Sequence, residues 1–361
     1  MKTSWMGVSV ATAITAATVL APATADAQSS VTLYGIVDVG VQFTNHNVAA
    51  GGKAGSTFSA VSGGAQTSRW GLRVREDLGG NYAAIAVLEN GFDATKGTAN
   101  NSGRLFGRSS YVGIDSPYGT FTMGRHVTGV YDFSVWFDPV GPAIYSSVVY
   151  DLAFVSRADN SLRYVGKFGV LGGKLMVEQL YSFGYDSVSG AGPVAGAYRV
   201  GKEESLFVTY NRGIGTLGLL FDQQNGNAIA TQGVKTQRYG VGVSVDLEPV
   251  QLYAAYRFYG QKQPGQNLYS SLYWVAARYT IRPDLNVSSD LFYQDDRNTG
   301  QGNPLMLSIL ASYLLSKRTD VYVQLGTILN KKHSSLGFAG FNTVTTGAVQ
   351  TGAMVGIRTR F

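Results

Sequence analysis

Arginines recur on one side of an extended segment near the start of the chain, at Arg69, Arg73 and Arg75. Alternate side chains of a β-strand point to opposite faces, so these three guanidinium groups would share one face of segment 68–78. The opposite face carries Trp, Leu and Val, which favour apolar surroundings, whereas the arginine face requires water. A row of fixed cations beside water attracts anions. The chemistry that these residues indicate is selection of charged solutes rather than bond making.

Further cations extend this row onto neighbouring segments, and we call the predicted set the basic wall. Its other members are Arg108, Arg125 and Arg163, and Lys167, Arg358 and Arg360 could join them. Arg125 is the weaker candidate, because it shares strand alternation with the apolar Phe121 and Met123. A solvated face of an ordinary soluble sheet is the simpler alternative. The alternation of the whole chain favours the wall of a water-filled lumen.

One long segment, residues 127–160, interrupts the run of strand-like pieces. A loop of this length is usually functional or disordered, and this one is too aromatic and apolar for a solvated tail. We expect it to fold back into the lumen, with Asp132 and Asp138 facing the basic wall and Asp151 behind them. Opposed charges at a narrowing decide which ions enter. Asp138 precedes Pro139, so capping of a turn explains that carboxylate equally well.

Catalytic and metal-binding patterns are scarce. The chain has no cysteine, no G-x-S-x-G elbow and no phosphate-binding loop, and its three histidines are far apart in the sequence. His126 and Asp132 form the one pair that could act as a general acid and base at a barrel rim. A lone loop histidine is more often simply polar, so the sequence predicts no catalytic residue, no cofactor and no metal. The arginines do not form one exposed stripe, which argues against nucleic acid.

Strand alternation continues along the whole chain in sixteen segments, from residues 31–41 to residues 351–361. Short turns and longer loops follow one another regularly, which is typical of an up-and-down barrel. No proline falls inside a proposed strand, where it would remove a hydrogen-bond donor. In lipid an open sheet edge is not tolerated, so the last strand must pair with the first. The sequence predicts an all-β fold, a 16-stranded antiparallel transmembrane β-barrel with an inward-folded third external loop.

Composition and the N-terminus indicate an exported protein. Residues 1–27 contain a lysine, an apolar run and an Ala-Asp-Ala exit, which is the pattern of a signal peptide; an N-terminal membrane anchor would need a longer, more apolar run. Residues 28–361 then form one barrel unit, because no linker or change of period divides them. The chain has 46 glycines and 22 tyrosines, a formal net charge of +6 and a mean hydropathy of +0.01. Its stability without disulfides must come from burial and backbone pairing.

The chain resembles the Gram-negative general porins, in particular their β-proteobacterial branch. The resemblance is carried by SSVTLYGIVDVGV (29–41), SRWGLRVREDLGG (68–80), AVLENGF (86–92), RSSYVGI (108–114), YGTFTMGR (118–125), NSLRYVG (160–166) and the terminal Phe361. It implies a homotrimer in outer-membrane lipid and lipopolysaccharide, with segment 127–160 as the constricting loop and Phe361 as the signal for the barrel-assembly machinery. The loop lacks a PEFGG-type motif, so the resemblance does not fix its acidic residues.

The expected function is therefore a passive, water-filled outer-membrane channel for small hydrophilic solutes and ions, with a preference for anions. One alternative is a channel selective for organic acids, in which arginines bind carboxylates bidentately. An alternative of another class is an enzyme or adhesin that uses the barrel as a scaffold. Paired catalytic groups at the rim would favour the enzyme, and a blocked lumen would favour the adhesin.

Overall fold

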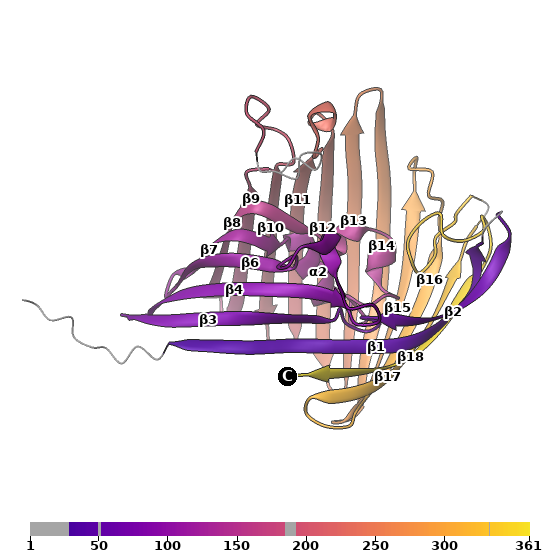
Figure 1. The fold of residues 1–361 in the computed structure, drawn as a ribbon, viewed down its shortest axis with the longest axis horizontal. Helices are drawn as coiled ribbons and strands as arrows, with labels where there is room; N and C mark the ends of the chain where they lie inside the picture. Colours follow the sequence, from indigo (N-terminus) through magenta and orange to yellow (C-terminus); the bar gives the residue numbers. More distant parts are fainter. Residues whose placement is uncertain (1–28, 50–51, 185–192, 332) are drawn as a thin grey trace, which may run out of the picture.

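A single closed sheet forms the body of the computed structural model, which describes residues 29–49, 52–184, 193–331 and 333–361. Every pairing between strands is antiparallel, and from β6 to β18 each strand pairs with the next along the chain, as in an up-and-down barrel (Figure 1). The strands are β1 (Ser30–Val48), β2 (Ala54–Ser62), β3 (Arg69–Gly79), β4 (Tyr82–Asp93), β5 (Thr98–Ala99), β6 (Ser109–Ser116), β7 (Gly119–Val127), β8 (Arg157–Val170), β9 (Gly173–Ser182), β10 (Glu203–Arg212), β11 (Gly215–Asn225), β12 (Lys235–Leu247), β13 (Val250–Gln263), β14 (Gln266–Arg282), β15 (Leu285–Asp296), β16 (Leu305–Leu314), β17 (Thr319–Leu329) and β18 (Gln350–Arg360). The helices are α1 (Asn100–Gly103), α2 (Gly129–Phe137) and the short 3₁₀ turns η1 (Ser147–Val149), η2 (Leu152–Val155) and η3 (Ile229–Thr231).

The two faces of the sheet follow strand alternation. On β14, Tyr273 and Val275 are 43% and 55% exposed, whereas Leu272 and Trp274 between them are 0% and 2% exposed. Large apolar side chains therefore point outward from the barrel, as an apolar solvent requires, while the inner face packs against chain inside the barrel. No helix among the described residues is both long and apolar enough to cross a membrane.

The last strand closes the barrel against the first, as predicted. β18 pairs with β1 in a register that sets Arg360 opposite Ile36 and Gly352 opposite Thr44. The terminal residue continues the ladder, because the Phe361 amide donates to the Gly35 carbonyl at 3.1 Å and the Gly35 amide donates back at 3.0 Å. Closure leaves no free edge, so the backbone groups of the seam strands are paired.

Strand β2 is the one long strand that the sequence analysis missed, and helix α2 was also not predicted. β2 pairs with residues 39–48 of β1, and β3 pairs with residues 30–36 of the same strand, so β2 and β3 occupy one position of a barrel with sixteen positions. The sequence of β2, AGSTFSAVS, has Phe58 as its only large side chain, so its alternation is too weak to see. β5 is a two-residue pairing at the tip of β4 and adds no position.

Between β2 and β3 the chain leaves the wall and enters the lumen. Asp38 on β1 holds this kink, because its fully buried carboxylate accepts hydrogen bonds from the amides of Ala65 at 3.0 Å and Gln66 at 2.6 Å. The Tyr322 hydroxyl donates to the second oxygen at 2.7 Å. These three hydrogen bonds offset the cost of removing the Asp38 carboxylate from water. We call residues 63–68 the lumenal kink.

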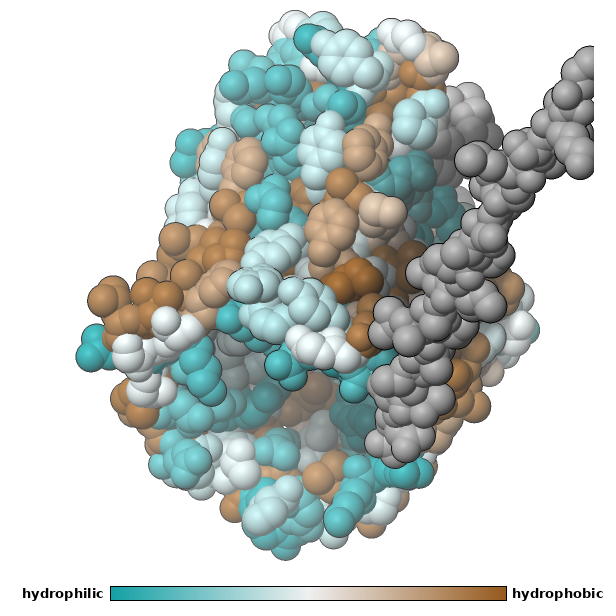
Figure 2. Space-filling view, turned by 90° about the vertical axis from the view of Figure 1, so that its left-hand side faces the viewer, coloured by the Kyte–Doolittle hydropathy of each residue, from teal (hydrophilic) through white to brown (hydrophobic). Residues whose placement is uncertain are grey.

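The ends of the barrel differ. Turns at one end are short, such as residues 80–81, 117–118 and 213–214, whereas the other end carries the longer loops. The longest connection with no strand is residues 128–156, between β7 and β8, which we call L3; the sequence analysis placed it at 127–160. Seen from the side on which β3 ends, the surface is hollowed, and hydrophilic residues surround the hollow while hydrophobic residues gather on the flanks (Figure 2). The predicted signal peptide, residues 1–27, lies outside the described residues.

The lumenal kink yields a test of the fold. We expect Asp38→Ala to lower the free energy of unfolding by about 1–3 kcal/mol for each buried donor that it leaves unpaired. Tyr322→Phe should cost less, because it removes one donor and leaves Asp38 its two amides. The measurement is the temperature at which the folded band of unboiled protein converts to the unfolded band in a detergent gel. Equal midpoints for Asp38→Ala and the unmodified chain would contradict this role.

Candidate functional site

L3 enters the barrel at its first residues. The Thr128 hydroxyl caps α2 by accepting from the Tyr131 amide at 3.4 Å, and Asp132 places negative charge in the first turn, where the helix dipole favours it. The helix ends where Asp138 precedes Pro139, because the residue before a proline avoids helical geometry. The Gly129 amide donates to the Ser205 hydroxyl on β10 at 3.1 Å. Helix α2 therefore lies inside the ring of strands, between β6–β9 in front and β10–β14 behind (Figure 1).

Aromatic residues of L3 fasten it to the inner face of β10–β14. Phe133 and Phe137 are one helical turn apart, so they share a face of α2, and both are fully buried. The Phe133 ring packs edge-on against Trp274 with centroids 5.8 Å apart, and the Trp274 indole donates to the Phe137 carbonyl at 2.8 Å. A Cβ atom at Gly218 or Gly242 would collide with the Phe137 ring, so only glycine at these wall positions admits it.

The second part of L3 crosses to the seam of the barrel. The Ile144 amide donates to the Gly64 carbonyl in the lumenal kink at 3.0 Å. Gln42 on β1 donates to the Tyr145 hydroxyl at 2.8 Å, and the Tyr145 ring stacks on Phe338 with centroids 3.9 Å apart. L3 thus contacts the wall at β10–β14 and again at β1 and the lumenal kink, on opposite sides of the lumen. Toward β3–β8, L3 reaches the wall through the side chains of Tyr131 and Asp132, and we call this side the open face.

The open face carries the predicted basic wall. Glu89 on β4 lies between two arginines, with its carboxylate 2.6 Å from Arg108 Nε and 3.6 Å from Arg69 Nε. Tyr34 donates to Glu89 at 2.9 Å, and the Arg73 guanidinium lies over the Tyr34 ring at 4.2 Å. The structure thus brings Arg69, Arg73 and Arg108 together around Glu89 and Tyr34. Arg75 lies nearer the turn end, where it pairs with Asp115 at 2.8 Å and is exposed.

Arg157, the first residue of β8, was missed by the sequence analysis. Its guanidinium lies over the Tyr131 ring of α2 at 5.1 Å and donates to the Val155 carbonyl. Its Nε and Nη2 atoms are buried and have no hydrogen-bond partner. Arg108 and Arg125 are close enough to repel it electrostatically. A desolvated cation beside like charges is unfavourable unless an anion comes to it.

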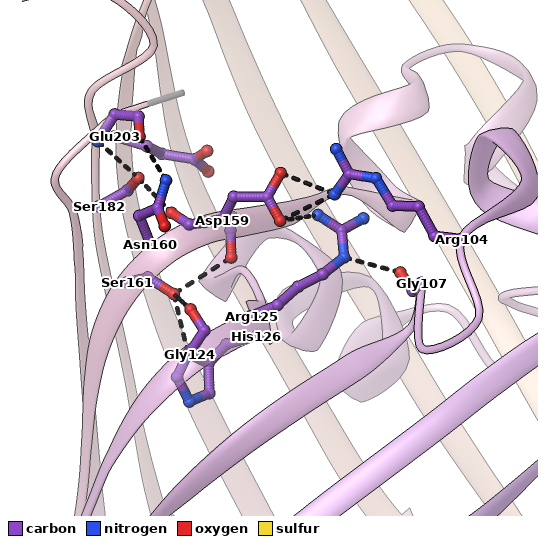
Figure 3. Close-up of polar contacts among 12 residues, drawn as sticks. Arg104, Gly107, Gly124, Arg125, His126, Asp159, Asn160, Ser161, Ser182 and Glu203 are labelled. Atoms are coloured by element: carbon purple, nitrogen blue, oxygen red, sulfur yellow. Dashed lines mark hydrogen bonds and ion pairs between the residues drawn. The ribbon is translucent and has the colours of Figure 1, made fainter. Parts of the chain in front are cut away.

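Arg125 faces the lumen despite its unfavourable alternation. The pairing of β7 with β8 shifts register between Gly124 and His126, and this bulge turns the side chain at position 125 inward. Arg125 then pairs with Asp159 at 2.6 Å and donates to the Gly107 carbonyl at 2.8 Å (Figure 3). Arg104, from the loop after β5, holds the same carboxylate from its other side at 2.8 Å (Figure 3). Arg104, Arg125 and Asp159 line a polar cavity of about 280 Å³, and Arg157 lines the same cavity.

Asp132 meets the basic wall through Arg163. The Arg163 guanidinium on β8 is 2.7 Å from the Asp132 carboxylate and 2.8 Å from Glu178 on β9. Burial raises the pKa of Asp132, and repulsion by Glu178 raises it further, because one guanidinium cannot fully neutralise two carboxylates. His126, which the sequence allowed as a catalytic partner of Asp132, instead bonds to the Ser161 hydroxyl at 2.8 Å.

The other two predicted carboxylates of L3 do not face the basic wall. Asp138 is 1% exposed, and its carboxylate accepts from the amides of Gly141 at 2.7 Å and Ser147 at 2.9 Å. These bonds stabilise the fold of L3, so we revise the hypothesis for Asp138 in favour of turn capping. Asp151 points to β12, where Arg238 holds it at 2.9 Å. Burial alone would raise the pKa of Asp151, but Arg238 and Arg257 outweigh it and lower the pKa.

Comparisons with known proteins agree with this architecture. The sequence model of the Gram-negative porin family matches residues 11–333. The chain belongs to the Gram-negative porin family. It is 28% identical to outer-membrane porin protein 32 of Delftia acidovorans, over 96% of this chain and 99% of that protein. It is also 28% identical to an outer-membrane porin of Bordetella pertussis, over 82% of this chain and 88% of the relative.

A solved structure extends the likeness to the fold. The anion-selective porin from Comamonas acidovorans superposes with a TM-score of 0.79 at 27% identity, covering 92% of this chain and all of that structure. This chain is therefore an outer-membrane porin with the fold that its sequence predicted, and porins are channels rather than enzymes. In such barrels the short turns face the periplasm and the longer loops face outward.

The attachment of L3 yields a test of what sets the channel's width. We expect Phe137→Ala to free α2 from the wall, because truncating a buried aromatic side chain costs about 3–5 kcal/mol of local packing. Single-channel recordings should then show a larger and noisier conductance. The control is Phe121→Ala, which truncates a 44%-exposed ring on the outer face. An unchanged conductance in a folded Phe137→Ala channel would mean that L3 does not define the width.

Proposed function

We propose that this porin prefers anions, and that the preference arises where solutes pass between L3 and the basic wall. The residues that we assign to this constriction are Arg69, Arg73, Arg75, Arg108, Arg125 and Arg163 of the predicted wall, with Arg157 added. Asp132 is the carboxylate of L3 on the same side. Asp138 and Asp151 support the loop from behind, as their contacts indicate.

The surplus of cations around Glu89 carries this proposal. Arg69 and Arg108 share that single carboxylate, and Arg157 has buried nitrogen atoms without a hydrogen-bond partner. Two of the three positive charges therefore remain uncompensated by an ion pair on the open face. Low-dielectric protein on both sides concentrates the field of such charges in the water between them. Anions gain from this field and cations are repelled by it.

The comparisons support the same direction. The similar structure from Comamonas acidovorans is described as an anion-selective porin, and its fold covers nearly all of this chain. We further propose that the channel works as a homotrimer in outer-membrane lipid and lipopolysaccharide. Phe361 would be the signal to the assembly machinery. Its ring packs over Gly35 and is half exposed, so a partner can contact it at the seam between the first and last strands.

The proposal is tested by the reversal potential of the purified porin in a planar bilayer under a KCl gradient. We expect an anion-favouring potential that collapses when Arg69, Arg108 and Arg157 are changed together to Gln. One guanidinium at contact distance changes the energy of an ion by about 1 kcal/mol in water, so the chloride-to-potassium permeability ratio should fall by about fivefold or more.

A matched control separates the constriction from net charge. Changing Arg212, Arg282 and Arg297 to Gln removes the same charge from three exposed positions outside the constriction. The reversal potential of this variant should stay close to that of the unmodified porin. Collapse of the potential in both variants would assign selectivity to overall charge, and collapse in neither would discard the basic wall.

The raised pKa of Asp132 predicts that selectivity depends on pH. As the pH is lowered from neutral to acidic values, this carboxyl takes up a proton before an ordinary carboxyl with a pKa of about 3.9 does, because burial and Glu178 raise its pKa. Loss of its negative charge leaves Arg163 less compensated, so anion preference should increase. Asp132→Asn should show the higher preference at neutral and at acidic pH. The exposed Asp284→Asn should keep the pH dependence, and a pH-independent wild type would contradict the assignment.

A further inference from the structure

A second basic cavity lies on the other side of L3 from Arg157. Its volume is about 350 Å³, and its roof is the segment of L3 from Pro139 to Pro142. Its wall is the inner face of β14–β18, with the lumenal kink at one edge. A wider cavity of about 760 Å³ adjoins it at the turn end and shares two lining residues, Arg278 and Asn286. The smaller cavity therefore opens toward the periplasm.

Strand register places polar residues side by side across this wall. Arg278 on β14 pairs with Ser288, and Asn286 on the same strand as Ser288 pairs with Ser312. On the far side, Asp320 of β17 pairs with Arg358 of β18. With Arg360 and Gln66, these side chains supply guanidinium, hydroxyl and amide donors around one space. Such a set of donors suits an acceptor-rich solute.

Arginine charge exceeds carboxylate charge among the residues that line this cavity. Arg358 holds Asp320 through two bonds of 3.1 and 2.8 Å, and Arg360 shares the same carboxylate at 2.7 Å. Arg278 has only neutral hydrogen-bond partners: its Nε donates to the Ser288 hydroxyl at 3.3 Å and its Nη2 to the Pro139 carbonyl at 2.9 Å. Three guanidinium groups thus line the cavity with a single carboxylate, which is itself fully buried.

Three further carboxylates lie close to the cavity without lining it, and Asp246 and Glu248 line the wider cavity that adjoins it. Asp138 is buried in L3 and receives the amides of Gly141 and Ser147. Asp38 is buried and receives the amides of the lumenal kink and the Tyr322 hydroxyl. Asp290 is buried between the wall and L3. None of the three lines the smaller cavity, so the charged groups that a solute meets there are mainly cationic.

We propose that this cavity is an anion-binding site of the periplasmic vestibule, which takes small oxyanions of the phosphate class. Guanidinium groups bind such anions through paired, charge-assisted hydrogen bonds, and the neighbouring hydroxyl and amide groups complete the shell. The inference rests on the proposed anion preference and extends it. An anion would bind first at the constriction and then in the cavity beneath L3, so the channel has two separate anion-binding sites, one on each side of L3.

The test uses inorganic phosphate as a blocker of chloride current through single channels of known orientation. The chain has no cysteine, so Thr231→Cys in the loop at η3 gives a unique site for biotin. Streptavidin added to one chamber then reports which side carries the loops. We expect phosphate added on the periplasmic side to reduce the chloride current at a lower concentration than phosphate added on the loop side.

The variant that removes the site changes Arg278, Arg358 and Arg360 to Gln together with Asp320→Asn, so that no buried carboxylate loses its partners. We expect it to need about tenfold more periplasmic phosphate for the same block, as loss of charge-assisted hydrogen bonds implies. Arg278→Gln alone breaks no direct ion pair, although it removes the positive charge nearest to the buried Asp290, and it should show part of this effect. The control, Arg282→Gln with Arg318→Gln, removes the same net charge from exposed turn positions.

Each outcome decides between the sites. Equal block from both sides that the cavity variants do not change would overturn the proposal. Block that disappears only when Arg69, Arg108 and Arg157 are changed would place phosphate at the constriction and also overturn it. A wild type without anion preference in KCl, yet with a one-sided block lost in the cavity variant, would reject the proposed function and keep this site.

Discussion

Packing of L3 aromatic side chains into gaps in the barrel wall is the interaction on which the channel depends. A barrel with sixteen positions is wide enough to leave an aqueous channel, so its interior needs a separate element to narrow it. Phe133 and Phe137 supply this element with apolar contact area, and glycines of β11 and β12 supply the space. Without these gaps the helix would stand off the wall and block the lumen instead of lining it.

This packing divides the lumen by chemistry. The apolar contacts lie along β10–β18, where L3 and the wall exclude water from each other. The charged residues of the basic wall lie along β3–β8, and a second group of arginines lines the cavity beneath L3 on β14 and β18. The separation is favourable for both kinds of residue. A guanidinium group needs water or a charged or polar partner, whereas an aromatic ring is stable when it is buried without either. The channel therefore runs along the side of the lumen that is not filled by hydrophobic packing of L3.

Alternation is a local property of a strand, and it predicted the barrel, the closing of the last strand on the first and the lumenal side of Arg69 and Arg73. It failed where a local rule is broken. β2 has small side chains on both faces, and the bulge after Gly124 turns Arg125 around. The inward position of Arg125 therefore depends on a register shift between β7 and β8, which cannot be recognised from the pattern of residue types.

Residues in loops were harder to predict than residues in strands, because their partners are distant in the sequence. Arg157 adjoins the basic wall only through the path of L3, and Arg104 only through the loop after β5. Asp151 was predicted to lie behind Asp132 and Asp138, and its partner Arg238, which the sequence did not indicate, is 87 residues away. Asp138 was left between two roles by the sequence, and the amides of Gly141 and Ser147 decide in favour of the turn.

The attachment of L3 to the lumenal kink and to β1 links the constriction to the seam. The seam is where the two ends of the chain meet, so it is the last contact to form when the barrel closes and the first place where it can part. Gln42 and Gly64, which hold Tyr145 and Ile144, lie beside that join. A barrel whose seam is not yet closed therefore lacks the contacts that hold L3 and fix the width of the channel. A chain acquires its sieving property only in the same event that makes it a closed cylinder.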